Sequence, residues 1–219
     1  MESKNFIFGT AGFAKEVDWL IQEIENYSNK GFTTDYFVAE NDSSLIETSI
    51  NNAKVISENQ FESEFEGAIK NCFIAVGSPH LKKKIYDRFK SLSNINFPNL
   101  IHPSVNFDKR EGKIILGIGN IICAKNIITT DVTFKDFVHM NLDCTLGHDS
   151  VIGSFTTISP GSHISGNVII DELVFIGTGA CILENIKIAE EVKIGSGAVL
   201  VKSALEKGTY VGIPAKRIV

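Results

Sequence analysis

A six-residue rhythm of large apolar side chains runs through the second half of the chain. It comprises fifteen consecutive positions, at every sixth residue from Leu116 to Leu200. A small or β-branched residue stands two positions earlier in most repeats, as at Val138, Cys144 and Thr156. Because a period of six fits neither a helix nor a flat strand, the chain must turn a corner after each short strand. This hexapeptide repeat predicts a parallel β-helix.

Three such strands would close one triangular coil, so apolar residues 18 positions apart are expected to stack inside a prism. The predicted inner column contains Ile122, Met140, Ile158, Ile176 and Ile194. Glycine follows the apolar position in several repeats, where we expect tight corners with backbone angles that favour glycine. These glycines are Gly117, Gly147, Gly153, Gly177 and Gly195. A β-sandwich is a poorer alternative, since sandwich strands rarely keep one fixed period.

The first hundred residues alternate between strand-like and helix-like apolar segments. Strands are predicted at residues 6–8, 36–39, 54–56 and 73–76, a helix follows the first of them from Phe13 to Ile24, and Pro79 opens another helix. This alternation predicts a small parallel sheet, a half-Rossmann unit. The expected domains are therefore an α/β domain at residues 1–98 and a β-helix with a C-terminal tail at residues 99–219.

A glycine turn, residues 9–12, follows the first predicted strand and opens the first helix. Ligands of parallel sheets bind beyond the carboxyl ends of the strands, and a helix N-terminus there favours a phosphate. The turn lacks the full GxGxxG spacing, however, and a purely structural turn explains it equally well. Glu40 and Gly77 end neighbouring predicted strands and join this candidate edge.

The charge balance argues against nucleic acid as a partner, because the chain carries a net charge of −5 with an isoelectric point near 5.6. One basic cluster spans residues 82–90, where Leu81, Ile85 and Phe89 recur every four residues. We interpret these apolar residues as the buried side of a helix and the lysines as its solvated face.

Cysteine usage and the N-terminal segment bear on the compartment. The four cysteines form no CxxC pair, which indicates neither a metal knuckle nor a disulfide framework. The N-terminus lacks the features of a signal peptide, and no apolar run is long enough to span a membrane. We expect a cytoplasmic protein with reduced cysteines and no membrane partner.

Four segments, taken together and in order, resemble one known family. They are FIFGTAGFAKEV, AVGSPHLKKKIYDRF, NLDCTLGHDSVIG and VGIPAKRI. The chain resembles the bacterial sugar acyltransferases, which include the nucleotide-amino-sugar N-acetyltransferases of bacillosamine and perosamine synthesis and the sialic-acid O-acetyltransferases. The resemblance implies a left-handed parallel β-helix, an exception to the usual right-handed crossover. It also implies a homotrimer that uses acetyl-CoA as co-substrate and needs no metal.

The resemblance assigns roles to particular positions. His148 corresponds to the general base, Asp149 to the acid that orients it, and Asn141 to a polar catalytic position. Coenzyme contacts are implied for Thr157, Thr178 and Ser196, with Lys216 near a phosphate, and nucleotide-sugar contacts are implied for Ala11, Gly12, Phe13, Glu40 and Gly77. Two departures stand out. Relatives often carry a pair of aspartates after the second strand, whereas this chain reads FVAEND, and Gly147 stands where they can place another acid.

The activity that the resemblance implies is acetyl-CoA-dependent N-acetylation of a nucleotide-linked amino sugar for bacterial polysaccharide biosynthesis. An imidazole can accept the amine proton near neutral pH, which typically contributes about 10² to 10⁴-fold in rate. Thr157 lies nine residues from His148, which is half of one coil, so the two should lie on different sides of one prism. We therefore expect a site in a groove between subunits.

Three alternatives remain open. The first is O-acetylation of a sugar such as sialic acid. The second is a zinc hydratase, which would need His139, His148 and His163 to converge, although their spacings of 9 and 15 make that difficult. The third is a nucleotide-binding scaffold without chemistry. We interpret His139 and His163 as solvated wall residues, and His80 and His102, which adjoin prolines, as turn residues.

Overall fold

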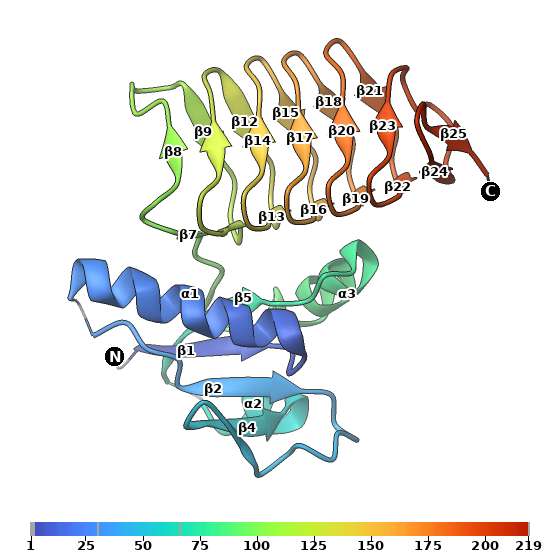
Figure 1. Ribbon diagram of the computed structural model, residues 1–219. Helices are drawn as coiled ribbons and strands as arrows, with labels where there is room; N and C mark the ends of the chain where they lie inside the picture. Colours follow the sequence, from blue (N-terminus) through green and yellow to red (C-terminus); the bar gives the residue numbers. More distant parts are fainter. Residues whose placement is uncertain (1–2, 30, 66, 219) are drawn as a thin grey trace. The chain divides into compact units, whose positions relative to one another are not determined.

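The computed structural model describes residues 3–29, 31–65 and 67–218. The chain divides into two compact units (Figure 1). Met1–Gly77 and Leu81–Asn99 form the first, here called the α/β unit, whereas Ser78–His80 and Leu100–Val219 form the second, here called the prism. Among the described residues, no helix combines the length and the apolar character that crossing a membrane requires.

The α/β unit is built on a mainly parallel sheet of six strands in the order β3-β4-β2-β1-β5-β6. Their bounds are β1 Ser3–Phe8, β2 Tyr36–Ala39, β3 Ser49–Ile50, β4 Ala53–Ser57, β5 Ile69–Ile74 and β6 Ile95–Asn96. The four predicted strands correspond to β1, β2, β4 and β5, and the pairing of β3 with β4 is antiparallel. Because β1 and β2 occupy the middle of the sheet, the chain segments that follow them meet at its carboxyl edge.

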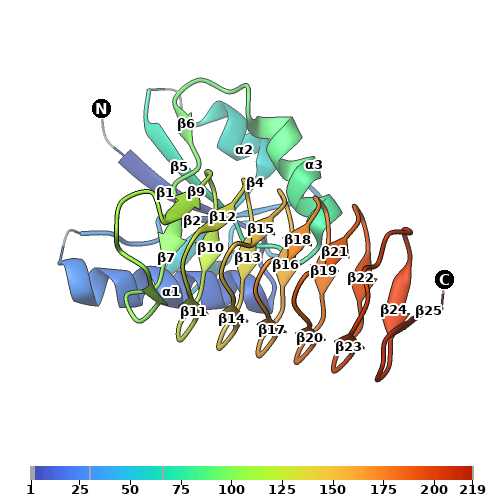
Figure 2. The ribbon, with the colours of Figure 1, turned by 90° about the horizontal axis from the view of Figure 1, so that it is seen from above.

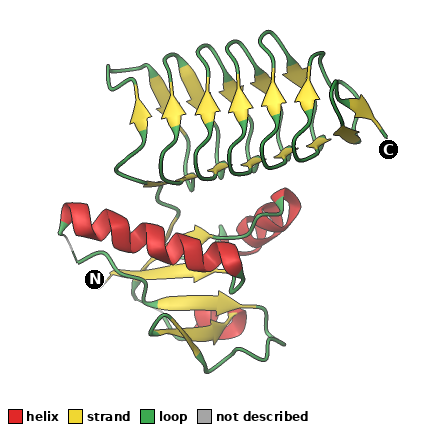
Figure 3. Cartoon of the chain, in the orientation of Figure 1, coloured by secondary structure: helices red, strands yellow, loops and turns green. Residues whose placement is uncertain are grey.

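Three helices pack on this sheet: α1 Gly12–Ser28, α2 Glu58–Ser63 and α3 Pro79–Phe89 (Figure 3). The predictions of α1 and of a helix opened by Pro79 are confirmed. The apolar pattern does not predict α2, because six residues are too few to show a helical period. Instead, a capping box marks its start: the Ser57 side chain accepts from the Gln60 N–H, and the Gln60 side chain accepts from the Ser57 N–H.

Aromatic side chains dominate one face of the sheet. Phe6 and Phe8 of β1 each meet Phe61 of α2 edge to face at a ring-centroid distance of 4.9 Å, and Phe89 of α3 joins the same cluster. One expectation for α3 is wrong. Lys82 is not on a solvated face but fully buried, and burial holds the pKa of its ammonium group well below the ordinary lysine value.

The prism consists of short strands stacked in three walls, and the strands are parallel except for the antiparallel pair of β24 and β25 (Figures 1 and 2). The eight-stranded wall contains β7 Leu100–Ile101, β10 Ile121–Ile122, β13 His139–Met140, β16 Thr157–Ile158, β19 Phe175–Ile176, β22 Lys193–Ile194, β24 Thr209–Val211 and β25 Lys216–Arg217. The six-stranded wall contains β8 Asn106–Phe107, β11 Ile127–Ile128, β14 Thr145–Leu146, β17 His163–Ile164, β20 Cys181–Ile182 and β23 Val199–Leu200. The five-stranded wall contains β9 Ile114–Leu116, β12 Val132–Phe134, β15 Val151–Ile152, β18 Ile169–Ile170 and β21 Lys187–Ile188.

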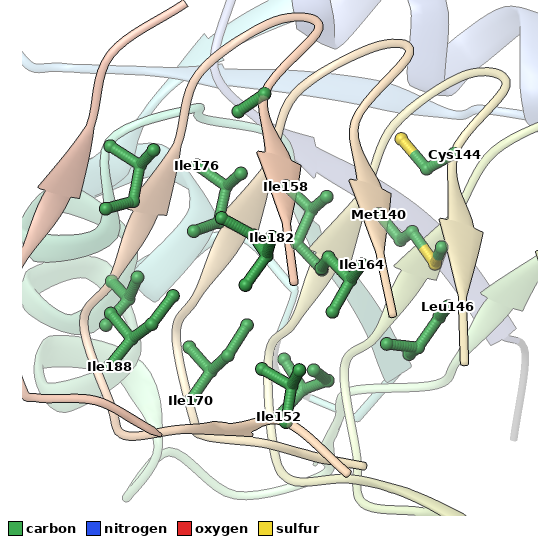
Figure 4. Close-up of a cluster of buried hydrophobic side chains, with 14 of the residues drawn as sticks. Met140, Cys144, Leu146, Ile152, Ile158, Ile164, Ile170, Ile176, Ile182 and Ile188 are labelled. Atoms are coloured by element: carbon green, nitrogen blue, oxygen red, sulfur yellow. The ribbon is translucent and has the colours of Figure 1, made fainter. Parts of the chain in front are cut away.

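The predicted stacking of residues 18 positions apart is confirmed. Ile122 pairs with Met140, Met140 with Ile158, and Ile158 with Ile176. Figure 4 shows the inward side chains, from Met140 to Ile188, gathered inside the prism. Complete burial of one such side chain contributes about 1.5 to 3 kcal/mol, so the repeated column is the main source of the prism's stability.

The corners of the prism follow the same period but use a different residue from the one expected. Every sixth residue from Gly119 to Gly197 has a positive φ, and ten of these fourteen residues are not glycine. The glycines that follow the apolar positions do not have a positive φ, so the expectation of unusual angles there is wrong. They are needed for space, because a Cβ atom at Gly147 or Gly153 would lie 2.4 Å from the backbone of the next coil.

Candidate active site

His148 stands in the turn between β14 and β15, where the chain passes from the six-stranded to the five-stranded wall. We call this row of turns, residues 147–150 and their equivalents in each coil, the His148 corner. The side chain points out of the prism and is 62% exposed. Its Nδ1 lies 2.7 Å from Oδ2 of Asp149. An exposed imidazole with one nitrogen held by a carboxylate can act as a base through its other nitrogen.

The position of Asp149 depends on its backbone conformation as well as on its hydrogen bond with His148. Its φ is +57°, the left-handed conformation that aspartate and asparagine tolerate better than most residues. The same position carries Asp131 one coil earlier and Asn167 and Asn185 in the following coils, all with positive φ. Asp149 therefore satisfies the corner geometry of the prism and binds the histidine with the same side chain.

Two glycines bring the coils together beneath His148. A Cβ atom on Gly147 would lie 2.4 Å from the amide nitrogen of Gly166, so an acidic side chain at 147 would require the backbone to move. Gly166 itself lies directly under the His148 ring. Gly166 is not among the predicted site residues, although its position 18 residues after His148, one coil further on, could have indicated it.

The other predicted residues of the prism lie elsewhere. Asn141, Thr178 and Ser196 lie in turns from the eight-stranded to the six-stranded wall, a row that we call the Thr178 corner. Within one chain, the whole six-stranded wall separates this corner from the His148 corner. The structure therefore brings His148 and Asp149 together and places Asn141 with the candidate coenzyme contacts. The Asn141 side chain accepts a hydrogen bond from the Leu142 N–H at 2.8 Å.

Thr157 and Lys216 differ from these corner residues. Thr157 lies in β16, where it is 6% exposed, and its hydroxyl has no hydrogen-bond partner among the described residues. Lys216 is exposed in β25, which pairs antiparallel with β24. A buried hydroxyl and an exposed lysine are chemically suited to different parts of a coenzyme, a carbonyl or amide for the first and a phosphate for the second.

The remaining histidines of the prism do not converge with His148. His139 lies in β13 and is 1% exposed, so the expectation of a solvated residue is wrong for His139. His163 is exposed in β17, with Nδ1 3.0 Å from the Thr145 hydroxyl. In the part of the chain that the structure describes, no group of three or more histidine, cysteine, aspartate or glutamate side chains is arranged to hold a metal ion.

The candidate nucleotide-sugar residues meet at the carboxyl edge of the α/β sheet. Ala11, Gly12 and Phe13 follow β1, Glu40 follows β2, and Gly77 follows β5. Ala11, Gly12, Glu40 and Gly77 are exposed, and a Cβ atom on Gly12 or Gly77 would meet nothing within 4 Å. The edge is therefore open, and its backbone can approach a ligand closely.

The helix that begins at this edge has an uncapped N-terminus. Ala11 is the N-cap residue of α1, its side chain makes no cap hydrogen bond, and the first turn carries no acidic residue. At the same edge, α2 has both its capping box and a hydrogen bond from the Asn59 N–H to the Asn41 side chain. Ala11 offers no side-chain oxygen to the start of α1, whereas Ser57 offers one to the start of α2, and a helix N-terminus of this kind is suited to an anion.

The chain is similar to known proteins in its first part and over most of its length. The model of the PglD N-terminal domain matches residues 4–89. The GDP-perosamine N-acetyltransferase of Escherichia coli O157:H7 is 28% identical over 169 residues, which are 76% of this chain and 72% of that relative.

Solved structures match the whole chain. The acetyltransferase domain of PglB from Neisseria gonorrhoeae FA1090 is 30% identical with a TM-score of 0.85, over 99% of this chain and 100% of that one. The same domain in complex with acetyl coenzyme A gives a TM-score of 0.84 at 29% identity over 100% of both chains. PerB from Caulobacter crescentus, solved with CoA and GDP-perosamine, shares the fold with a TM-score of 0.86, 23% identity and coverage of 99% and 98%.

These matches identify the prism as a left-handed β-helix, the fold of the hexapeptide-repeat transferases. Within that class, the chain belongs to the sugar acetyltransferases that combine this β-helix with a PglD-type N-terminal domain.

Proposed function

We propose that this protein transfers the acetyl group of acetyl-CoA to the amino group of a nucleotide-linked sugar, with His148 as the general base. The observation that carries the proposal is the His148–Asp149 pair, joined at 2.7 Å on an exposed corner of the prism. The named activities of the E. coli relative and the coenzyme of the PglB domain support the choice of substrates. The product would serve as a building block for bacterial polysaccharide biosynthesis.

The proton transfer is assigned to one nitrogen of the imidazole. A carboxylate accepts hydrogen bonds but cannot donate them, so the Nδ1–H of His148 donates to Oδ2 of Asp149. The lone pair of Nε2 is then free to accept a proton from the attacking amine. Asp149 also stabilises the imidazolium that forms, because its negative charge lies next to the new positive charge.

The chemistry requires one addition and one elimination. The sugar nitrogen attacks the thioester carbonyl carbon as its proton passes to Nε2 of His148, which forms the new C–N bond. The C–S bond then breaks, and the thiolate of coenzyme A leaves and takes up the proton held by the imidazolium, which restores the neutral base. Because a thiolate is a good leaving group, the reaction needs no covalent enzyme intermediate. A thiol nucleophile at Cys144 is disfavoured, since burial raises the pKa of that thiol to about 11.

Binding of the nucleotide is assigned to the open edge of the α/β sheet. The uncapped N-terminus of α1 would hold a phosphate through the backbone N–H groups that follow Ala11, with Gly12 and Gly77 leaving room for it. Glu40 follows β2 directly, at the position from which an acidic side chain can accept a hydrogen bond from a ribose hydroxyl.

We further propose that the active protein is a homotrimer whose active site lies in a groove between two chains. The separation of the His148 corner from Asn141, Thr178 and Ser196 within one chain supports this proposal. One chain would supply His148 and Asp149, and its neighbour would supply the Thr178 corner against the coenzyme. Mixing His148→Ala with Thr178→Trp, each inactive alone, should restore part of the activity by forming sites with two intact halves. No recovery in trimers shown to contain both variants would contradict the shared groove.

The activity itself is tested by following thiol release from acetyl-CoA with a panel of acceptors. The panel contains GDP- and UDP-linked amino sugars, the same sugars without nucleotide, and free sialic acid. Turnover with a nucleotide-linked amino sugar, confirmed by an amide in the product mass spectrum, is the expected result. Turnover with sialic acid alone would indicate an O-acetyltransferase instead. No turnover with any acceptor would favour a scaffold without chemistry.

A further inference from the structure

The imidazole of His148 rests on a residue of the next coil that has no side chain. A Cβ atom built on Gly166 would lie 2.6 Å from both Cε1 and Nε2 of His148 and 3.0 Å from Cδ2. Those three ring atoms are the nearest heavy atoms to that position. The ring edge that carries Nε2 therefore occupies the space that any other residue at 166 would fill.

The ring is thus restrained on two sides. Asp149 holds Nδ1 at 2.7 Å, and Gly166 lies against the Cε1–Nε2 part of the ring. The backbone also ties the two coils together here, since the Asn167 N–H donates to the His148 carbonyl at 2.7 Å. Because the side chain is otherwise largely exposed, these neighbours determine where Nε2 points.

We infer that Gly166 is a positioning residue for the base. Because Gly166 has no side chain, it leaves a space, here called the seat, that the His148 ring occupies and that fixes the position of Nε2. The inference rests on the proposed function of His148 in acetyl transfer. A methyl group at 166 would push the ring off this seat, and the ring could then move only by lengthening or rotating its bond to Asp149. Misplacement of a reacting group by about 1 Å can cost about 100-fold in rate.

A purely structural role for Gly166 makes a different prediction. Gly153 serves as the reference, because the atoms that obstruct a Cβ there belong to the backbone of Asp171 and Glu172 at 2.4 to 2.6 Å. At Gly166 the obstructing atoms belong to the imidazole of His148. Neither glycine has a positive φ, so alanine suits the backbone at both positions and the steric contact is isolated. Removal of the imidazole should therefore relieve the contact at 166 and not the contact at 153.

The experiment compares Gly166→Ala and Gly153→Ala, each in the wild-type and in the His148→Ala background. We expect Gly166→Ala to lower kcat about 100-fold, with KM for both substrates near the wild-type values. The imidazole resonances of His148 should shift in NMR spectra. The variant should lose little thermal stability in the wild-type background, because the obstructing atoms are the end of an exposed side chain that can move, and none in the His148→Ala background. Gly153→Ala should lose stability equally in both backgrounds.

Two outcomes would overturn the inference. The first is a Gly166→Ala variant with wild-type kcat and unshifted His148 resonances. The second is an equal loss of Tm in both backgrounds, which would assign Gly166 to coil packing alone. Failure of the proposed function is recognised separately: a wild-type protein without acetyl transfer would refute that function, while the resonances and the Tm comparison would still decide whether the seat exists.

Discussion

The prism and the α/β unit offer chemistry in contrasting ways. At the His148 corner, side chains carry the candidate chemistry: an exposed imidazole, a carboxylate at 2.7 Å and a glycine seat. At the carboxyl edge of the α/β sheet, the backbone carries it, through the uncapped start of α1 and two glycines in open space. The contrast indicates that the two regions serve different steps of the reaction, catalysis at the His148 corner and binding of the nucleotide sugar at the α/β edge. Substitutions of His148, Asp149 or Gly166 should lower kcat, whereas substitutions at the edge should raise KM for the nucleotide sugar.

The largest expected effect comes from His148→Ala, which removes the base. We expect kcat to fall by about 10² to 10⁴-fold, the usual contribution of general base catalysis. Binding of acetyl-CoA, measured by calorimetry, should persist. His163→Ala is the matched control, because His163 is also exposed on the prism with Nδ1 engaged, but by a threonine hydroxyl at 3.0 Å. Equal losses in the two variants would break the distinction between them.

Asp149→Asn should have the next largest effect. Asparagine tolerates the left-handed φ of +57° and keeps the shape of the side chain, so the variant removes the charge alone. Hydrogen bonds to charged groups contribute about 1.5 to 3 kcal/mol, and the exposure of this pair favours the lower end, which is about tenfold in kcat.

Asp131→Asn tests the same change one coil earlier. Asp131 has the same corner conformation but pairs with Lys113 at 2.7 Å and follows a threonine. Its substitution should leave kcat unchanged in the steady-state assay. A loss of kcat in Asp131→Asn as large as that in Asp149→Asn would show that corner charge, rather than the histidine partner, is responsible.

Ala11→Asp should stabilise the free protein but weaken the binding of the nucleotide sugar at the α/β edge. A carboxylate at the N-cap would accept the first N–H groups of α1 and stabilise the free protein by about 0.5 to 2 kcal/mol. It would also repel a phosphate from the same site, which should raise KM for the nucleotide sugar about tenfold, equivalent to about 1.4 kcal/mol.

Ala11→Ser supplies the cap without the charge and should therefore raise Tm with a smaller change in KM. The measurements are thermal unfolding of the free protein and steady-state kinetics with the nucleotide sugar varied. An unchanged KM in Ala11→Asp would place the phosphate elsewhere.

The smallest expected effect on turnover comes from Lys82→Met, which concerns folding rather than catalysis. Burial lowers the pKa of Lys82, so between its folded and unfolded pKa values the unfolded state binds more protons, and wild-type stability rises with pH. Lys82→Met has no buried ammonium group, so it should be more stable than the wild type at neutral pH. The difference should shrink as pH approaches the ordinary lysine value of 10.5. Urea unfolding at both pH values measures it, and a raised KM in this variant would instead assign Lys82 to the binding edge.

The hydrophobic period predicted the prism well because burial acts on every repeat. The same period could not reveal the corner conformation, since most of the residues with positive φ are not glycine and carry no common signal. It also could not show that Lys82 and His139 are buried, because a polar side chain breaks the apolar pattern wherever it lies. Burial at such positions depends on tertiary packing that a local pattern does not contain.

The candidate site was predictable where its residues adjoin in sequence. His148 and Asp149 are neighbours, and one hydrogen bond joins them. The sequence does not indicate Gly166, because a glycine has no side chain that could suggest a chemical role. Its proposed role depends on the stacking of the coils, which places it under the imidazole of His148. The absence of a side-chain cap at the start of α1 stands out when it is compared with α2, which has a complete capping box.

The regular corners also constrain how this fold can vary in length. Insertion or deletion of 18 residues adds or removes one coil and leaves each wall in order. Deletion of six residues would preserve the apolar rhythm perfectly yet carry every later residue round to the next wall. Between His148 and Thr178, such a deletion would move the Thr178 corner to a different edge of the prism while the core remained intact. In this architecture, a length change invisible to packing can abolish the geometry of catalysis.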